Sequence, residues 1–370
     1  MKPAFIPGLK LAQEFHAEII APLLGRLFPG LAYSAARLDS GSEVLGFDDQ
    51  TSVDHDWGPR LTLYLSEEDI PRYSEQINRA LADQLPHEFK GYPTNFSAPT
   101  PENGGSQVLE PVTNGPVNHR VSILTVHGFF SFYLGFDITQ DLQPVDWLTF
   151  SEQRLRTITA GPIFHDELGL EAVRARFTYY PPDVWLYLLA AAWRRIGQED
   201  HLMGRAGLVG DEVGSALIGA RLVRDCMRLC FLMERTYAPY AKWFGSAFKQ
   251  LSCAASLWPV FQGALHAETW QAREGYLVRA YEELAARHNA LKLTASLPDK
   301  VAAFYGRPLR VISQNGFEQA LLKAIQDPAV KRIAALPLIG NLDMFSDNVD
   351  LVSDPAWRPR LRQLFGATDV

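Results

Sequence analysis

Two short segments combine residue types that can bind phosphates and metal ions. Gly41-Ser42 is followed, after eleven residues (43 to 53), by Asp54-His55-Asp56. Two aspartates separated by one residue point to the same face of an extended backbone, and carboxylate oxygens are preferred ligands of Mg²⁺. A Gly-Ser turn lets backbone amides and a hydroxyl approach phosphate oxygens. The pattern favours phosphoryl or nucleotidyl transfer, which depends mainly on positioning and charge neutralisation. The alternative is a solvated turn.

This ordered pair resembles the signature of the nucleotidyltransferase superfamily that includes kanamycin nucleotidyltransferase and the minimal nucleotidyltransferases. Longer segments are similar to a bacterial nucleotidyltransferase-like group known only as a domain of unknown function: 41–48, 54–60, 183–187 and 239–243. The resemblance implies an α/β catalytic domain in which Asp54 and Asp56 hold two Mg²⁺ ions. It also implies that Gly41 and Ser42 lie against the triphosphate of an NTP substrate.

The third acid of the superfamily has no obvious counterpart here. The resemblance implies a carboxylate on a neighbouring strand, yet the matching segment, residues 119–123, contains no Asp or Glu. His119 is the candidate in its place, because a neutral imidazole can accept a proton or bind a metal. The alternative for His119 is a polar residue at a strand end, and Glu110 in the preceding loop is a weaker candidate acid. Pro59 cannot donate to a ladder, so we expect strand pairing to be interrupted between the aspartates and the next strand.

Two cations are candidate phosphate ligands. The resemblance implies that Lys242, in the helical half of the chain, reaches the nucleotide phosphates across a cleft. A compact ammonium suits a phosphate, and the alternative is a surface lysine whose stem covers Trp243. Arg60, close to the aspartates in sequence, is the second candidate.

Four glycines form a separate cluster that fits no nucleotide motif. Gly204, Gly207, Gly210 and Gly214 match neither GxGxxG nor a P-loop. Their spacing predicts close helix packing or a turn between helices. The alternative gives Asp211, which lies among them, a role in binding an acceptor.

The elements that must position these residues follow from apolar spacing and turn residues. We predict a helix over 8–28, a strand over 61–65, a helix over 71–85, one or two strands within 119–136, a hairpin over 161–180, and helices from 183 to 288 that break at 204–214 and at Pro239. Residues 91–118 are rich in Pro and Gly and predict a long irregular insertion. The predicted class is α+β: a nucleotidyltransferase-like α/β domain with a mixed sheet over 1–180, then a mostly helical domain over 181–370 that completes the cleft.

Composition excludes several classes of protein. The 370 residues are 47% hydrophobic and 21% charged, as in ordinary globular proteins. Lys and Arg total 35 against 42 Asp and Glu, and the net charge of −7 argues against bulk nucleic-acid binding. The longest apolar run, 184–193, is shorter than the roughly 20 residues of a membrane span. The N-terminus lacks the pattern of a secretion signal, and the three cysteines form no CxxC pair. We expect a cytoplasmic protein.

The leading prediction is therefore an Mg²⁺-dependent enzyme that moves an NMP, with AMP favoured, from an NTP to an acceptor hydroxyl and releases pyrophosphate. A small molecule is the favoured acceptor, with a protein or an RNA end left open. One alternative is a noncatalytic nucleotide-binding or partner-binding scaffold of the same fold. Another takes Arg195 and His201, on a predicted helix, as the pair of a metal-independent ribonuclease.

Overall fold

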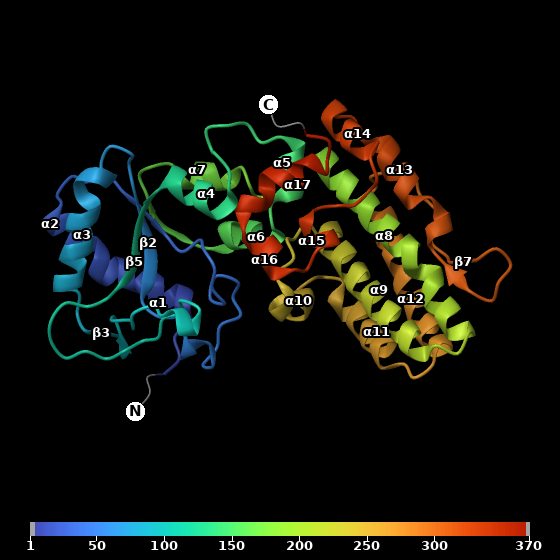
Figure 1. The fold of residues 1–370 in the computed structure, drawn as a ribbon, viewed down its shortest axis with the longest axis horizontal. Coiled ribbons are helices and arrows are strands. Elements are labelled where there is room, and N and C mark those ends of the chain that lie inside the picture. Colours follow the sequence, from blue (N-terminus) through green and yellow to red (C-terminus); the bar gives the residue numbers. More distant parts are fainter. Residues whose placement is uncertain (1–3, 368–370) are drawn as a thin grey trace. The chain divides into compact units, whose positions relative to one another are not determined.

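The computed structural model describes residues 4–367, which separate into two compact units (Figure 1). The first unit comprises the chain up to Asp141 together with Arg154–Thr178, and the second comprises Leu142–Gln153 and the chain from Tyr179 onward. A mixed sheet with helices forms the first unit and helices dominate the second, so the predicted α+β class is confirmed.

The sheet of the first unit has four strands in the order β5-β2-β1-β6. Strand β1 (Ser34–Ala36) pairs antiparallel with β2 (Arg60–Leu65) and with β6 (Ile163–Asp166). Strand β5 (Arg120–Thr125) pairs in parallel with β2, from Arg60 opposite Arg120 to Leu65 opposite Thr125. Every residue of β2 is buried, as expected of an inner strand covered on both faces. The first residues of β2 and β5 therefore lie side by side.

Helices and one irregular segment complete this unit. The predicted helix over 8–28 is present as α1 (Gly8–Phe15), a π-helical turn (His16–Ile20) and α2 (Ala21–Leu27). Helix α3 (Ile70–Gln84) follows β2, as predicted. The core joins α1, α3 and β2 to the irregular 91–118 segment through these buried side chains: Leu11, Phe15, Trp57, Leu61, Leu63, Ile77, Leu81, Tyr92 and Val117. The segment is thus anchored on the core and can hold a site in place.

One local prediction is wrong. The hairpin predicted over 161–180 is absent, because β6 is followed by helix α7 (Leu170–Ala175). The carboxylate of Asp166 accepts the amide hydrogens of Leu170 and Glu171, which stabilises the start of that helix. The prediction of one or two strands within 119–136 is confirmed by one, β5, and helix α4 (Val126–Leu134) follows it directly.

The second unit is built around long helices. Helices α8 (Pro182–Leu208) and α9 (Glu212–Met233) are joined by a short turn and pack along each other. The other helices before residue 300 are α5 (Pro144–Thr149), α10 (Ala241–Phe248), α11 (Ala254–His266) and α12 (Trp270–Ala290). Two antiparallel strands of two residues each follow, β7 (Ala302–Ala303) and β8 (Arg310–Val311). The remaining helices are α13 (Phe317–Ala324), α14 (Pro328–Ala334), α15 (Leu342–Phe345), α16 (Val349–Ser353) and α17 (Arg358–Gln363). Helix α6 (Glu152–Ala160) begins in this unit and continues into the first. Across residues 4–367, none of the helices has both the length and the apolar character needed to cross a bilayer.

Candidate functional site

The Gly41-Ser42 segment forms a closed bend after β1. The Ser42 carbonyl accepts a hydrogen bond from the Phe47 amide at 2.9 Å, and the Glu43 carbonyl accepts one from the Gly46 amide at 3.0 Å. A Cβ atom on residue 41 would overlap the carboxylate of Glu43, so the close approach at this position requires glycine. The sequence pattern thus coincides with a tight turn whose backbone is packed against a buried acid.

Buried charges support this bend. Arg37 and Arg60 both donate to Oε1 of Glu43, through Nη2 atoms at 2.8 and 2.7 Å, and both also donate to the Ser40 carbonyl. Burial raises the pKa of Glu43, but the two guanidinium groups outweigh that effect and hold its pKa below the ordinary value. Arg60 is only 8% exposed. The structure therefore places Arg60, a candidate phosphate ligand, in a buried ion pair beneath the bend.

The two aspartates do not lie on one extended strand. Asp54 is the last residue of a 3-10 turn, Ser52–Asp54, and Asp56 has a left-handed backbone with φ of 48°. The Asp54 carboxylate is 66% exposed and contacts its neighbour His55, 2.9 Å from both the amide nitrogen and Nδ1. The spacing of the pair is that of the signature, but the alternation expected of a strand is absent at this point, and β2 begins only at Arg60.

Asp56 is paired with Arg120, a residue that belongs to none of the motifs found in the sequence. Its Oδ1 atom pairs with the guanidinium of Arg120 on β5 and accepts the Gln107 amide at 3.3 Å, while its own amide donates to the Gln107 carbonyl at 2.7 Å. Burial raises the pKa of Asp56, but Arg120, with a smaller contribution from Arg60, lowers it below the ordinary value. Arg60 thus acts on both Glu43 and Asp56, and one network of charges joins the bend to Asp56.

His119 has both ring nitrogens engaged next to β5. Nδ1 accepts the amide hydrogen of Val121 at 3.2 Å, so the proton lies on Nε2, 3.1 Å from the Asn78 carbonyl of α3. Burial lowers the pKa of His119, which favours the neutral ring. These contacts match the predicted alternative of a polar residue at a strand end. Glu110 is exposed and uses its backbone to bind Asn95.

A pocket of about 560 Å³ lies beside Asp54. Its polar edge is formed by Gln50, Thr51 and Asp54, and its remaining walls come from Phe5, Val53, Gly91, Tyr92, Pro93, Val108, Leu109 and Pro111. The Tyr92 ring is fixed, because its hydroxyl donates to the Ala4 carbonyl at 3.1 Å and accepts the Ile6 amide at 3.4 Å. Trp57 packs edge-on against Tyr92 with ring centroids 5.0 Å apart and stacks on Phe5. The pocket therefore combines a rigid aromatic wall with hydrogen-bonding groups, which suits a planar polar ligand.

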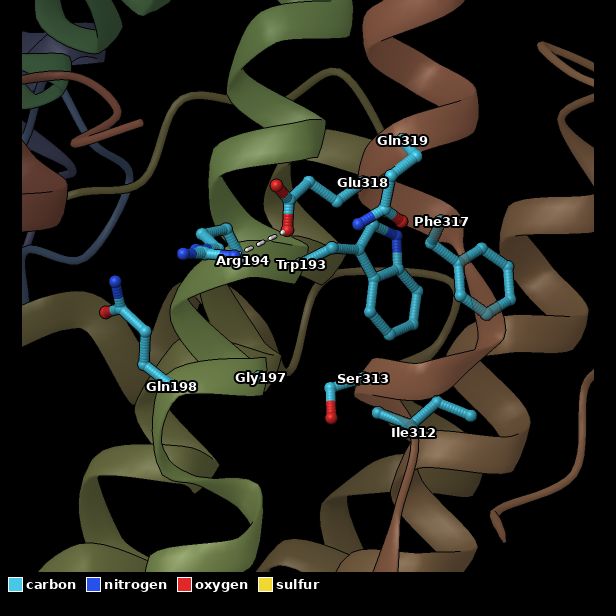
Figure 2. A pocket seen from close by; sticks show the side chains of 9 residues that line it. All are labelled: Trp193, Arg194, Gly197, Gln198, Ile312, Ser313, Phe317, Glu318 and Gln319. Atoms are coloured by element: carbon cyan, nitrogen blue, oxygen red, sulfur yellow. Dashed lines mark ion pairs between the residues drawn. The ribbon is translucent and has the colours of Figure 1, made fainter. Parts of the chain in front are cut away.

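The second unit contains a smaller pocket, of about 250 Å³, between α8, the Ile312–Ser313 segment and α13 (Figure 2). Trp193 and Phe317 stack there with centroids 4.4 Å apart. Arg194 pairs with Glu318 at 3.5 Å, as the dashed line in Figure 2 marks. None of the site residues predicted from the sequence lines this pocket.

Lys242 lies in the second unit, in the first turn of α10. Its Nζ atom sits 4.9 Å from the centroid of the Trp243 ring, a cation–π contact that agrees with the predicted alternative of a lysine covering Trp243. Its contact with nucleotide phosphates stays a prediction.

The donor set does not fit a site for two Mg²⁺ ions. Among residues 4–367, no three His, Cys, Asp or Glu side chains gather where they could hold a metal. Of the two predicted ligands, Asp56 is paired with Arg120, and strand β5 supplies that guanidinium where the superfamily is expected to supply a third carboxylate. We therefore derive no chemistry through Mg²⁺ at this site.

One segment of the chain matches a known protein family. Residues 147–244 match the family model described as a domain of unknown function, DUF4037. This confirms the predicted similarity to a domain family of unknown function for that segment, which includes Lys242 but neither Gly41-Ser42 nor the two aspartates. The structure also matches that of a nucleotidyltransferase-like protein from Exiguobacterium sibiricum, with 9% sequence identity, a TM-score of 0.29, and coverage of 80% of this chain and 97% of that one. No curated protein matches the sequence.

Proposed function

We propose that the protein binds a nucleotide, with the base in the pocket beside Asp54 and the phosphates at the Gly41-Ser42 bend. The observation that carries this proposal is the pocket itself. The apolar walls, which include the partly buried Phe5, offer a surface against which a flat heterocycle can pack, and the edge formed by Gln50, Thr51 and Asp54 offers hydrogen-bond donors and acceptors to its rim.

The bend supports the phosphate half of the proposal. Its folding uses the carbonyls of Ser42 and Glu43, and in the described part of the chain no hydrogen-bond partner is found for the Ser42 hydroxyl. The buried guanidinium groups of Arg37 and Arg60 lie beneath it, paired with the carboxylates of Glu43 and Asp39. A hydroxyl without a partner among the described residues and the backbone of a tight glycine turn are suitable partners for phosphate oxygens.

A second candidate is the Mg²⁺-dependent transfer of an NMP, with AMP favoured, from an NTP to a hydroxyl of a small molecule, a protein or an RNA end. The exposed carboxylate of Asp54 at the edge of the pocket favours it. The pairing of Asp56 with Arg120 makes binding without transfer the stronger candidate.

The test is calorimetric titration of the purified protein with each NTP, in EDTA and again with Mg²⁺, alongside an assay for released pyrophosphate in the presence of a metabolite extract. We expect saturable binding of at least one NTP in EDTA. Ser42→Ala should weaken it, and Asp54→Asn should weaken it if the carboxylate binds the base. Lack of binding for every NTP under both conditions would contradict the proposal, whereas pyrophosphate release that Asp54→Asn abolishes would establish transfer.

Two matched variants sharpen this test. Glu75→Gln changes a carboxylate that is 86% exposed on α3 and should leave NTP affinity unchanged. Lys242→Gln should lower affinity only if Lys242 leaves the Trp243 ring to bind phosphate. An unchanged affinity for this variant would remove Lys242 from the predicted site.

A further inference from the structure

The contact between Asp56 and Arg120 is built into the sheet. Strand β5 lies next to β2 in parallel, with Arg120 opposite Arg60, and Asp56 belongs to the turn that leads into β2. The guanidinium of Arg120 also lies over the Phe96 ring, 5.7 Å from its centroid. The cation is thus held between a carboxylate and an aromatic face, at a position fixed by strand register.

Asp56 keeps its position through contacts that do not involve Arg120. Its amide donates to the Gln107 carbonyl at 2.7 Å, and its Oδ1 accepts the Gln107 amide at 3.3 Å. Removal of the guanidinium would therefore leave a carboxylate that is still oriented but no longer neutralised. Asp56 is 36% exposed and Arg120 is 27% exposed, so a hydrated ion can reach the pair.

We propose that the guanidinium of Arg120 takes the place of a divalent cation at this site. The unmodified protein therefore excludes Mg²⁺ and Mn²⁺ from Asp54 and Asp56. A divalent-cation site exists only when the guanidinium is removed. The charges support this directly. A divalent ion that approaches Asp56 meets the positive charge of Arg120, and Arg60 adds to it because the electrostatic effect of Arg60 also reaches Asp56. Without Arg120, the ion meets the Asp56 carboxylate, which Gln107 still orients and no cation neutralises.

This inference concerns the cation alone and does not depend on nucleotide binding. Its failure is therefore distinguishable from failure of the proposed function, which is measured by NTP titration in EDTA. Loss of NTP binding leaves the metal count unchanged, and a change in the metal count leaves the NTP titration in EDTA unchanged.

The experiment titrates Mn²⁺ alone into the full-length protein and counts free Mn²⁺ by electron paramagnetic resonance. For the unmodified chain we expect no stoichiometric site. Arg120→Gln should gain one site per chain, with an affinity at least tenfold above that of the unmodified protein, and the double variant Arg120→Gln/Asp56→Asn should lose it. Arg79→Gln, which removes an exposed arginine of α3, is the matched control and should gain none.

Two further substitutions of Arg120 test whether its charge excludes the metal ion. Arg120→Met retains an unbranched stem beside Phe96 and replaces Arg120→Gln if the latter does not fold. Arg120→Lys retains a positive charge and should gain no site. A stoichiometric Mn²⁺ site in the unmodified chain that Asp56→Asn removes would overturn the inference, as would folded Arg120→Gln and Arg120→Met variants that both fail to bind Mn²⁺.

Discussion

Arg37 and Arg60 donate to one and the same oxygen, Oε1 of Glu43, and all three side chains are buried. Glu43 lies six positions after Arg37 and seventeen positions before Arg60 in sequence. The ion pairs therefore join the residue that follows β1, the Gly41-Ser42 bend and the first residue of β2. The carboxylate of this shared acid packs so closely against the bend that a Cβ on residue 41 would overlap it.

Glu43→Gln should lower the free energy of unfolding by about 3–5 kcal/mol, because it removes the buried charge that Arg37 and Arg60 share and leaves Asp39 as the remaining partner of Arg37. Urea unfolding at neutral pH measures this effect. The matched control is Glu75→Gln, which breaks an exposed pair with Arg79 on α3 and should cost less than about 1 kcal/mol. Equal losses for the two variants would show that the buried charges do not stabilise the fold.

Much of the fold could be predicted because it follows from local patterns. The apolar spacing of residues 8–28 and 71–85 matches the helices that form, and the run 61–65 matches β2. The hairpin expected over 161–180 is absent for a reason that apolar spacing does not reveal. The side chain of Asp166 caps the first turn of α7, and Gly169 adopts a φ of 74° just before it.

The candidate site could be predicted only in part. Gly41, Ser42 and Asp54 stand out by type and spacing, whereas the partner of Asp56 lies 64 residues away in sequence. Arg120 becomes a neighbour only through the parallel pairing of β5 with β2, which no local pattern specifies. The pocket beside Asp54 is likewise formed by residues from three distant segments, 5, 50–54 and 91–111.

Val108→Trp should weaken NTP binding at least tenfold by filling the pocket beside Asp54. Val108 lines this pocket and is 41% exposed, so a larger side chain has room to enter the cavity without displacing the core. Calorimetric titration measures the affinity, and the free energy of unfolding should change by less than about 0.5 kcal/mol. The control is Val213→Trp on α9, where the valine is 74% exposed and lines neither of the two pockets described above. Unchanged affinity for Val108→Trp would place the nucleotide elsewhere.

Acid should destabilise the protein through His288. This side chain is fully buried on α12, its Nδ1 accepts the Trp193 indole hydrogen at 3.2 Å, and burial lowers its pKa to about 4. In the unfolded chain the pKa of this imidazole is about 6.5. Between about pH 4 and pH 6.5 the unfolded chain therefore binds a proton there that the folded chain does not. The stabilising contribution is therefore complete above about pH 6.5 and is lost as the pH falls towards 4, by about 3 kcal/mol.

Urea unfolding at pH 7.5 and pH 4.5 tests this dependence. His288→Gln removes the titrating group and should reduce the difference between the two pH values, whatever the contribution of His16, whose pKa burial also lowers to about 4. His266→Gln, at an exposed position on α11, is the control and should leave the difference unchanged. If His288→Gln retains the full pH dependence, another group is responsible for it.

Gly207→Ala should destabilise the protein, whereas Gly275→Ala should stabilise it. Close helix packing, one of the two roles predicted for the glycine cluster, is confirmed at Gly207 of α8, where a Cβ would overlap the Trp270 side chain. Overpacking of this kind costs about 1–3 kcal/mol. Gly275 lies inside α12 with no atom within 4 Å of an added Cβ, so alanine should gain about 0.5–1 kcal/mol from helix propensity alone. Thermal or urea unfolding of the two variants should therefore shift in opposite directions. A shift of Gly207→Ala to higher stability would show that α8 can move away from Trp270, and that the glycine is not required for their contact.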